Sequence, residues 1–289
     1  MTTIRLGSKG EDVKVLQNYL GLKADGIFGL NTEKKVKEWQ KANGLVADGV
    51  VGTKSWAIIL NKITPTQKPA SKVLYVLLDN GHGNNTPGKR SPKFENGSQL
   101  LEYAYCRKVV DALYNKLKQH PEFCPIKITP EITDISLGTR VNRINSYCKK
   151  YGASNCIMIS VHLNAAGQGQ WMTARGWSTW TTRGQNSSDK LADCLYEGAD
   201  MIINANKDLL NTFKGKNQKP IREDKSDGDR DWESNFQIIR GSNCPATLSE
   251  NFFMDNKQDA TYLMSNKGFE DVVNIHLEGI KKYYNKYIK

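Results

Sequence analysis

The sequence of 289 residues lacks long hydrophobic runs. No segment approaches the roughly 18 consecutive apolar residues that a membrane-spanning helix requires. The first residues, MTTIRLGSKGEDV, also contain no apolar stretch of the kind found in secretory signal peptides. We therefore expect no membrane span, and we expect the chain to be synthesised in the cytoplasm without a signal peptide.

Cysteine and histidine are scarce, with six cysteines and four histidines in the chain. The cysteines include no C-x-x-C pair of the kind that binds a metal or forms a redox site. We expect them to be reduced and mostly buried, and we assign them no function. Arginine-rich runs and RNP-like aromatic motifs are absent too. The net charge of +11 therefore suits an anionic surface or polymer better than nucleic acid.

The first 61 residues show the pattern of a small helical domain. Apolar residues at helical spacing predict three short helices, over residues 7–20, 31–42 and 53–60. A turn of the form D-G-[IV]-[FV]-G follows each of the first two helices, at residues 25–29 and 48–52. Residues 62–72 contain two prolines and no hydrophobic periodicity, which predicts a linker. A second domain is then expected over residues 73–289.

This second domain alternates short apolar runs with amphipathic helical patterns. Such alternation predicts an α/β fold with a largely parallel sheet flanked by helices, preceded here by the small all-α three-helix domain. The predicted strands lie at residues 73–78, 126–129, 156–161, 175–181, 236–239 and 245–248. The predicted helices lie at residues 100–117, 138–151, 189–203 and 268–284, and the polar residues 211–233 are expected to form a surface excursion near the site.

Two of the four histidines directly follow predicted buried strands. His82 comes after the run at 73–78, and His162 comes after the run at 156–161. Ligands of α/β proteins bind beyond the carboxyl ends of the strands. Neutral imidazole is also the commonest metal ligand in proteins. The pair is compatible with a shared metal, and equally with two separate, hydrogen-bonded histidines at the edge of the sheet.

Catalytic zinc takes three nitrogen or oxygen ligands and leaves a fourth position for water. His82, His162 and one carboxylate would supply such a set. The carboxylate could be Glu102, in the first turn of a helix, or Glu95, in the preceding loop. We favour Glu102, because a helix holds a ligand more rigidly than a loop does. Glu250 ends another strand in an apolar setting that would raise its pKa, which suits a general base and acid.

The second domain resembles the zinc-dependent N-acetylmuramoyl-L-alanine amidase family of the Amidase_3 type. The resemblance lies in LLDNGHG (77–83), LLEYAYCRKVVDAL (100–113), RVNRIN (140–145), ISVHLNA (159–165), ARGWSTW (174–180) and FQIIRGSNCPATLSENFFMDN (236–256). It implies one Zn²⁺ per chain, with His82, Glu102 and His162 as ligands and Glu250 as the catalytic carboxylate. Asn164 and Arg240 are candidates for substrate contact.

The first domain resembles the three-helix peptidoglycan-binding domain of cell-wall hydrolases. The shared features are G-x-x-G-x-x-V-x-x-L-Q at residues 7–17 and Q-K-A-N-G-L-V-A-D-G-V-V-G at residues 40–52. The two resemblances imply a monomeric, endolysin-like peptidoglycan hydrolase that reaches the cell wall after release from the cytoplasm. It would cleave the amide between N-acetylmuramic acid and the L-alanine of the stem peptide.

Other functions are compatible with parts of this pattern. A zinc peptidase that cuts within the stem peptide would use the same metal ligands, and a bacterial autolysin would have the same amidase activity. A wall-binding protein with a decayed site is disfavoured, because His82, Glu102, His162 and Glu250 are all present. Nucleic-acid binding is disfavoured because no readout motif accompanies the positive charge.

Overall fold

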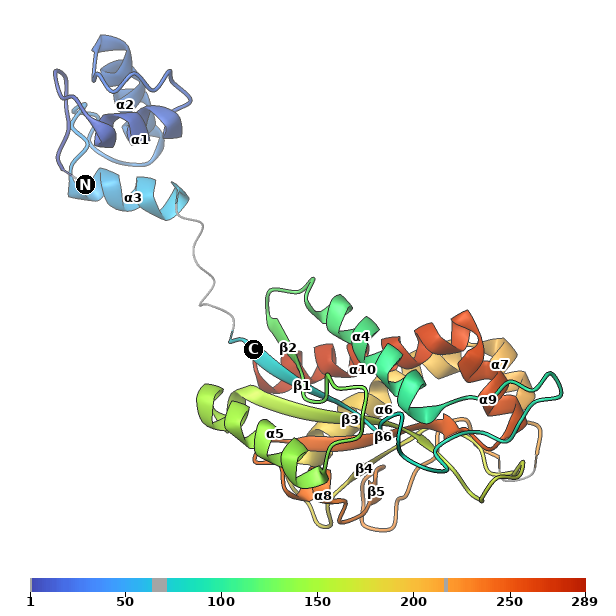
Figure 1. Cartoon of the computed structure of the whole chain (residues 1–289). Coiled ribbons are helices and arrows are strands. Elements are labelled where there is room, and N and C mark those ends of the chain that lie inside the picture. Colours follow the sequence, from blue (N-terminus) through green and yellow to red (C-terminus); the bar gives the residue numbers. More distant parts are fainter. Residues whose placement is uncertain (1, 64–71, 216–217) are drawn as a thin grey trace. The chain divides into compact units, whose positions relative to one another are not determined.

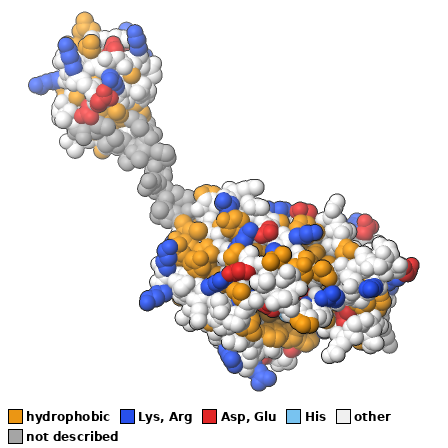
Figure 2. All heavy atoms as spheres, viewed as in Figure 1, with side chains coloured by type: hydrophobic (Ala, Val, Ile, Leu, Met, Phe, Trp, Pro, Cys, Tyr) orange, Lys and Arg blue, Asp and Glu red, His pale blue; other side chains and the backbone are white. Residues whose placement is uncertain are grey.

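The computed structural model describes residues 2–63, 72–215 and 218–289. The internal contacts of the chain separate two units, Met1–Ser71 and Lys72–Lys289, which are described one at a time. Most of the linker predicted over 62–72 lies outside the described residues. On the face of the larger unit shown in Figure 2, lysine and arginine side chains are scattered among apolar and acidic ones. The positive charge is therefore dispersed over this face.

The first unit contains the helices α1 (Glu11–Tyr19), α2 (Leu30–Ala42) and α3 (Thr53–Ile63) (Figure 1). Their apolar faces and the intervening turns form one small core. Its buried members are Ile4, Val13, Leu16, Phe28, Val36, Val51, Trp56 and Ile59. The three helices agree with the predicted helical pattern, in which one apolar stripe per helix faces the core.

Each repeated turn of this unit is held by a buried glutamine from the preceding helix. Gln17 Nε2 donates to Asp25 Oδ1 at 2.8 Å, and the backbone N–H of Gly26 donates back to Gln17 Oε1 at 2.8 Å. Gln40 makes the same exchange with the second turn, where its Nε2 donates to Asp48 Oδ1 at 2.9 Å. The repeated sequence thus corresponds to a repeated hydrogen-bonding unit that satisfies buried polar groups.

The larger unit is built on a six-stranded sheet. In spatial order its strands are β2 (Phe123–Lys127), β1 (Leu74–Asn80), β3 (Cys156–Asn164), β6 (Ala246–Phe253), β4 (Ser178–Thr181) and β5 (Trp232–Glu233). Neighbouring strands are parallel except for β4, which runs antiparallel to β6. This topology confirms the predicted largely parallel fold.

Helices cover both faces of this sheet (Figure 1). One face packs against α4 (Glu102–Leu117), α6 (Ser187–Ala205) and α10 (Asn266–Tyr287), and the other against α5 (Leu137–Tyr151) and α8 (Gln237–Arg240). The short helices α7 (Lys207–Thr212) and α9 (Lys257–Met264) and a 3-10 turn (Ala153–Asn155) complete the unit. Leu78 of β1 enters one core and Leu77 the other, so β1 is apolar from Leu74 to Leu78. No described helix combines the length and hydropathy needed to cross a membrane.

Two strand predictions in the carboxyl-terminal half were wrong in part. Residues 236–239, predicted as a strand, belong to the helical turn α8, where the N–H of Arg240 donates to the carbonyl of Phe236. A four-residue segment with three apolar residues does not distinguish a buried helical turn from a buried strand. The strand predicted over 175–181 is shorter and begins at Ser178. The expected helices over 100–117, 138–151, 189–203 and 268–284 correspond to α4, α5, α6 and α10.

The contact between α6 and α10 depends on a glycine. A Cβ atom placed on Gly198 would lie 2.4 Å from the carbonyl oxygen of Ile275, closer than real contacts allow. Because this neighbour is backbone within a helix, it cannot rotate away. The two helices can therefore approach this closely only where α6 has no side chain.

We expect Gly198→Ala to destabilise the larger unit. Overpacking costs about 1–3 kcal/mol, whereas alanine regains at most about 1 kcal/mol through its helix propensity. Scanning calorimetry of the full chain should show a midpoint lowered by several degrees, because about 1 kcal/mol shifts a domain of this size by about 2–4 °C. Met201→Ala, at an exposed position of α6, is the control and should leave the midpoint nearly unchanged. A Gly198→Ala midpoint at or above that of the parent would contradict the packing argument.

Candidate metal centre

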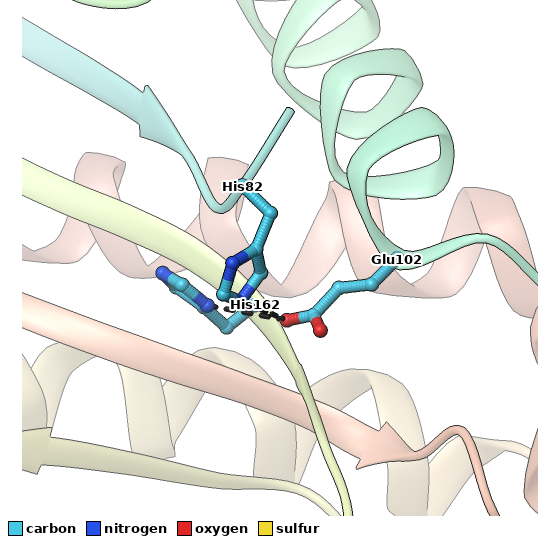
Figure 3. Close-up of side chains that lie close together, drawn as sticks. All are labelled: His82, Glu102 and His162. Atoms are coloured by element: carbon cyan, nitrogen blue, oxygen red, sulfur yellow. Dashed lines mark hydrogen bonds and ion pairs between the residues drawn. The ribbon is translucent and has the colours of Figure 1, made fainter. Parts of the chain in front are cut away.

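Three side chains from three different elements converge at the carboxyl edge of the sheet (Figure 3). His82 follows β1, His162 lies near the end of β3, and Glu102 is the first residue of α4. Glu102 Oε1 is 3.2 Å from His162 Nδ1 and 3.4 Å from His82 Nε2. One donor atom from each residue lies within 4.8 Å of the other two. This spacing is compact enough for the three residues to share one metal ion.

The turn after β1 is shaped for this convergence. His82 has a φ of 63°, in the left-handed region that residues other than glycine rarely occupy. A Cβ atom on Gly81 would lie 2.3 Å from His162 Cε1, so only glycine leaves room for the second imidazole ring. Strained backbone of this kind clusters at functional sites. The N-G-H-G sequence therefore has a steric reason at Gly81, whereas His82 adopts its backbone conformation at a cost in strain.

Glu102 is the most deeply buried member of the group. Its side chain is 1% exposed, its Oε1 accepts from the N–H of Leu163 at 3.1 Å, and its Oε2 is buried without a hydrogen-bond partner among the described residues. Burial would raise the pKa of Glu102, but hydrogen bonds with His162 and His82 outweigh it and hold the pKa well below its usual value. Glu102 is therefore a carboxylate, and a buried carboxylate oxygen without a donor fits a cation.

Glu95, the alternative carboxylate, lies apart from this group. Its side chain is 92% exposed and pairs with Lys257 Nζ at 2.9 Å. The structure thus brings Glu102 together with the histidines, and leaves Glu95 on the surface.

Glu250 lies on the neighbouring strand, beside the group. It is the register partner of His162 across the β3–β6 pairing. Its side chain is half-buried, and its Oε2 has no hydrogen-bond partner among the described residues. Burial raises the pKa of Glu250 to about 7, with His162 opposing this shift and Glu102 adding to it. A carboxyl group in this state can both accept and release a proton near neutral pH.

The two candidate substrate contacts lie in different places. Asn164 ends β3 close to His162 and is half-buried, with its Oδ1 accepting from the N–H of Ala165. Arg240 is exposed at the end of α8 and lines a cavity of about 690 Å³ that includes neither histidine. Among the described residues Arg240 forms no ion pair. The structure therefore places Asn164, but not Arg240, beside the centre.

A cavity of about 390 Å³ opens beside the two histidines. Its wall is formed largely by the loop before α5 and the start of that helix. The lining residues are Asp79, His82, Asp134, Ile135, Ser136, Leu137, Arg140, His162 and Ile238. Substrate groups next to the centre would contact this wall.

A buried ion pair behind the centre was not predicted from the sequence. Asp79 and Arg140 are 1% and 3% exposed, and Arg140 Nη1 lies 2.7 Å from Asp79 Oδ1. The same Nη1 donates to the carbonyl of Asn80 at 2.7 Å, and Ser160 Oγ donates to Asp79 Oδ2 at 2.5 Å. The available signal was an aspartate at the end of a buried strand, because a buried charge requires a partner.

A chain of hydrogen bonds continues from this ion pair to the residue after His82. Arg140 Nη2 donates to Asp134 Oδ1 at 2.7 Å, and Thr86 Oγ1 donates to Asp134 Oδ2 at 2.6 Å. Thr86 Oγ1 in turn accepts from the N–H of Gly83 at 3.0 Å. Arg140 therefore ties α5 and the cavity wall to the turn that carries His82.

Asn251 supports the other histidine in a similar way. Its Nδ2 donates to the carbonyl of His162 at 3.0 Å, and its Oδ1 accepts from Trp177 Nε1 at 2.9 Å. Asn251 and Trp177 are both fully buried. The backbone of His162 is thus fixed from β6 and from the segment that precedes β4, a contact that sequence spacing did not indicate.

Together these features define a class of protein. A largely parallel sheet carries two histidines and a buried glutamate at its carboxyl edge, with a second glutamate in register beside them. This is the architecture of an α/β enzyme with a candidate metal centre at the usual ligand-binding edge of the sheet.

The chain belongs to the N-acetylmuramoyl-L-alanine amidase family, which matches residues 76–282. Residues 9–59 match a peptidoglycan binding domain. These matches confirm the predicted amidase and its N-terminal peptidoglycan-binding domain.

Individual relatives agree with this assignment. The chain is 23% identical over 213 residues to the N-acetylmuramoyl-L-alanine amidase CwlM of Bacillus licheniformis, covering 73% of this chain and 68% of that protein. It is 27% identical over 214 residues to the endolysin of Bacillus phage SPP1, and the match covers 73% of this chain and 66% of the endolysin. The crystal structure of an amidase from Clostridium difficile 630 shares the fold, with a TM-score of 0.58 at 22% identity, covering 75% of this chain and 99% of that one.

We expect Arg140→Met to lower both stability and turnover. The substitution leaves Asp79 buried without its partner, a loss that typically costs about 3–5 kcal/mol, and it releases the turn that carries His82. Arg143→Met is the matched control, because Arg143 lies on the same helix in a half-exposed pair with Glu131, worth about 0–1 kcal/mol. Denaturant unfolding followed by circular dichroism, together with turnover on peptidoglycan, measures both effects. Equal losses in the two variants would refute a special role for Arg140.

Proposed function

We propose that the amidase reaction of this chain depends on one zinc ion held by His82, Glu102 and His162. The observation that carries the proposal is the convergence of two imidazoles and one buried carboxylate within 4.8 Å, with Glu102 Oε2 lacking a donor. Two nitrogen donors and one oxygen donor are a ligand set of catalytic zinc, which keeps a further position open. Bound zinc would supply Lewis acidity, which activates water and polarises the scissile carbonyl.

The reaction is hydrolysis of the amide that joins N-acetylmuramic acid to the L-alanine of the stem peptide. In our proposal Glu250 accepts the proton of the attacking water and delivers it to the leaving nitrogen. Its raised pKa and its position across from His162 support this role. The wall at residues 134–137 would orient the substrate, and the N-terminal domain would hold the enzyme on peptidoglycan.

A zinc peptidase that cuts within the stem peptide would use the same ligands. The family match over residues 76–282 favours the amidase. Product analysis on purified peptidoglycan separates the two, because only the amidase frees the amino group of L-alanine without other new amino termini. A chelator should abolish the reaction and added zinc should restore it.

We expect Glu102→Gln to lose zinc, because a neutral amide replaces the buried anionic ligand. Glu95→Gln is the matched control, since Glu95 is a surface carboxylate a few residues earlier in the chain. Zinc per chain, measured by elemental analysis after gel filtration, should fall well below stoichiometric only in Glu102→Gln. Stoichiometric zinc in Glu102→Gln, or its loss in Glu95→Gln, would exclude the proposed ligand set.

Glu250→Gln should retain zinc and lose turnover by about 10²–10⁴-fold, the usual contribution of a positioned general acid–base group. The measurement is the rate at which N-terminal alanine appears from purified peptidoglycan, with zinc content determined on the same sample. Turnover equal to that of the parent would remove Glu250 from the mechanism. Loss of zinc together with turnover would show that Glu250 serves the metal site instead.

A further inference from the structure

A second group of carboxylates lies in the larger unit. Asp189 is in the first turn of α6, and Asp229 and Asp231 immediately precede β5. One oxygen from each of the three lies within 4.8 Å of the other two. The group thus lies within the same distance limit as the two histidines and Glu102.

This group is separate from the amidase centre. Because β4 runs antiparallel to β6, its last residue, Thr181, lies toward the start of β6, and Thr181 Oγ1 donates to Asp231 Oδ2. Glu250 and the end of β6 mark the other edge of the sheet, where His162 lies. The three carboxylates therefore lie toward the amino end of β6, whereas His162 and Glu250 lie toward its carboxyl end.

Two oxygens of the group are buried and have no donor in the part of the chain that the structure describes. Asp231 is 1% exposed, and its Oδ1 has no hydrogen-bond partner among the described residues. The same holds for the buried Oδ1 of Asp229. A buried charged oxygen without a partner is costly, and neighbouring like charges add to the cost. These orphaned oxygens point to a ligand independently of the clustering itself.

One oxygen of each carboxylate accepts a hydrogen bond from the protein. Asp229 Oδ2 accepts from Gln185 Nε2 at 2.6 Å, and Asp189 Oδ2 accepts from the N–H of Asn186. These bonds, with that of Thr181, fix the orientation of all three carboxylates. A single ligand could therefore meet them without rearrangement.

Within the described part of the chain, no lysine, arginine or histidine nitrogen lies within 4.0 Å of these three carboxylates. Arg230, which lies between Asp229 and Asp231 in sequence, turns away and pairs with Asp200 and Glu223. Arg230 therefore neutralises other carboxylates and not this group. A positive ligand for the group must come from solution.

We propose that Asp189, Asp229 and Asp231 bind a hard divalent cation of the calcium type. Three carboxylates with no nitrogen or sulfur donor match the oxygen preference of such ions. A bound ion would join the start of α6, the end of β4 and the segment before β5. It would thereby fasten the short strands β4 and β5 to the rest of the sheet.

Terbium, a luminescent substitute for calcium, tests the site directly. Trp232 follows Asp231, and its ring lies 5.4 Å from that of Trp180, so indole excitation should sensitise a terbium ion bound here. Terbium is titrated into zinc-loaded full-length protein. We expect saturable sensitised emission that excess calcium displaces. Calcium alone should raise the thermal midpoint by about 3–6 °C once its free concentration exceeds the dissociation constant tenfold.

Asp231→Asn should abolish the emission and the calcium-dependent shift, and Asp229→Asn should weaken both at least tenfold. Asp227→Asn, at an exposed position of the same segment, is the matched control and should bind as the parent does. Retained zinc content shows that each variant is folded. Emission that is equal in Asp231→Asn and the parent would overturn the proposal. So would the absence of any calcium-dependent shift together with a higher midpoint in Asp231→Asn, which would mean that the carboxylates share a proton instead.

Discussion

The buried ion pair between Asp79 and Arg140 is the contact on which the geometry of the catalytic edge depends. Neither side chain is more than 3% exposed, so each charge requires the other to offset its desolvation. Asp79 also accepts from Ser160 on β3, and Arg140 reaches both the end of β1 and the cavity wall. One pair thus locks two strands and a helix together, directly behind the turn that presents His82.

The same requirement for partners separates structural from functional polar groups in this protein. Both oxygens of Asp79 have donors, as expected for a charge whose role is to hold the fold. In contrast, Glu102, Glu250 and Asp231 each have one buried oxygen for which the described parts of the chain supply no donor. Packing alone gives no reason to bury such an oxygen, because a smaller apolar side chain would cost less. Asp255 also has a buried Oδ1 without a donor among the described residues, while its Oδ2 accepts from the N–H groups of Ala166 and Gly167. An oxygen without a donor therefore supports our functional proposals only where it lies in a cluster of ligand-type side chains, as at Glu102 and Asp231.

The sequence predicted those features that are encoded locally. A strand buried on both faces contains a continuous apolar run, so the runs that precede His82 and His162 were recognisable. The parallel fold followed from the alternation of such runs with helices. The turn α8 was mistaken for a strand because a segment of only four residues is too short to show a helical or strand period. The partnership of Asp79 with Arg140, 61 residues apart, and the reversed direction of β4 depend on tertiary packing. Neither leaves a pattern in a short window of sequence.

The two units differ in the range of the contacts that specify them. In the peptidoglycan-binding domain Gln17 holds a turn eight residues away, and Gln40 repeats this contact, so a short motif holds each turn. In the catalytic unit Glu102 meets a histidine 60 residues further on, at the place where three elements converge. This long-range convergence brings together side chains from the turn after β1, the start of α4 and the end of β3. The sheet and its helices bring residues far apart in sequence together at the candidate centre, whereas the turns of the three-helix domain are held by contacts between residues close in sequence.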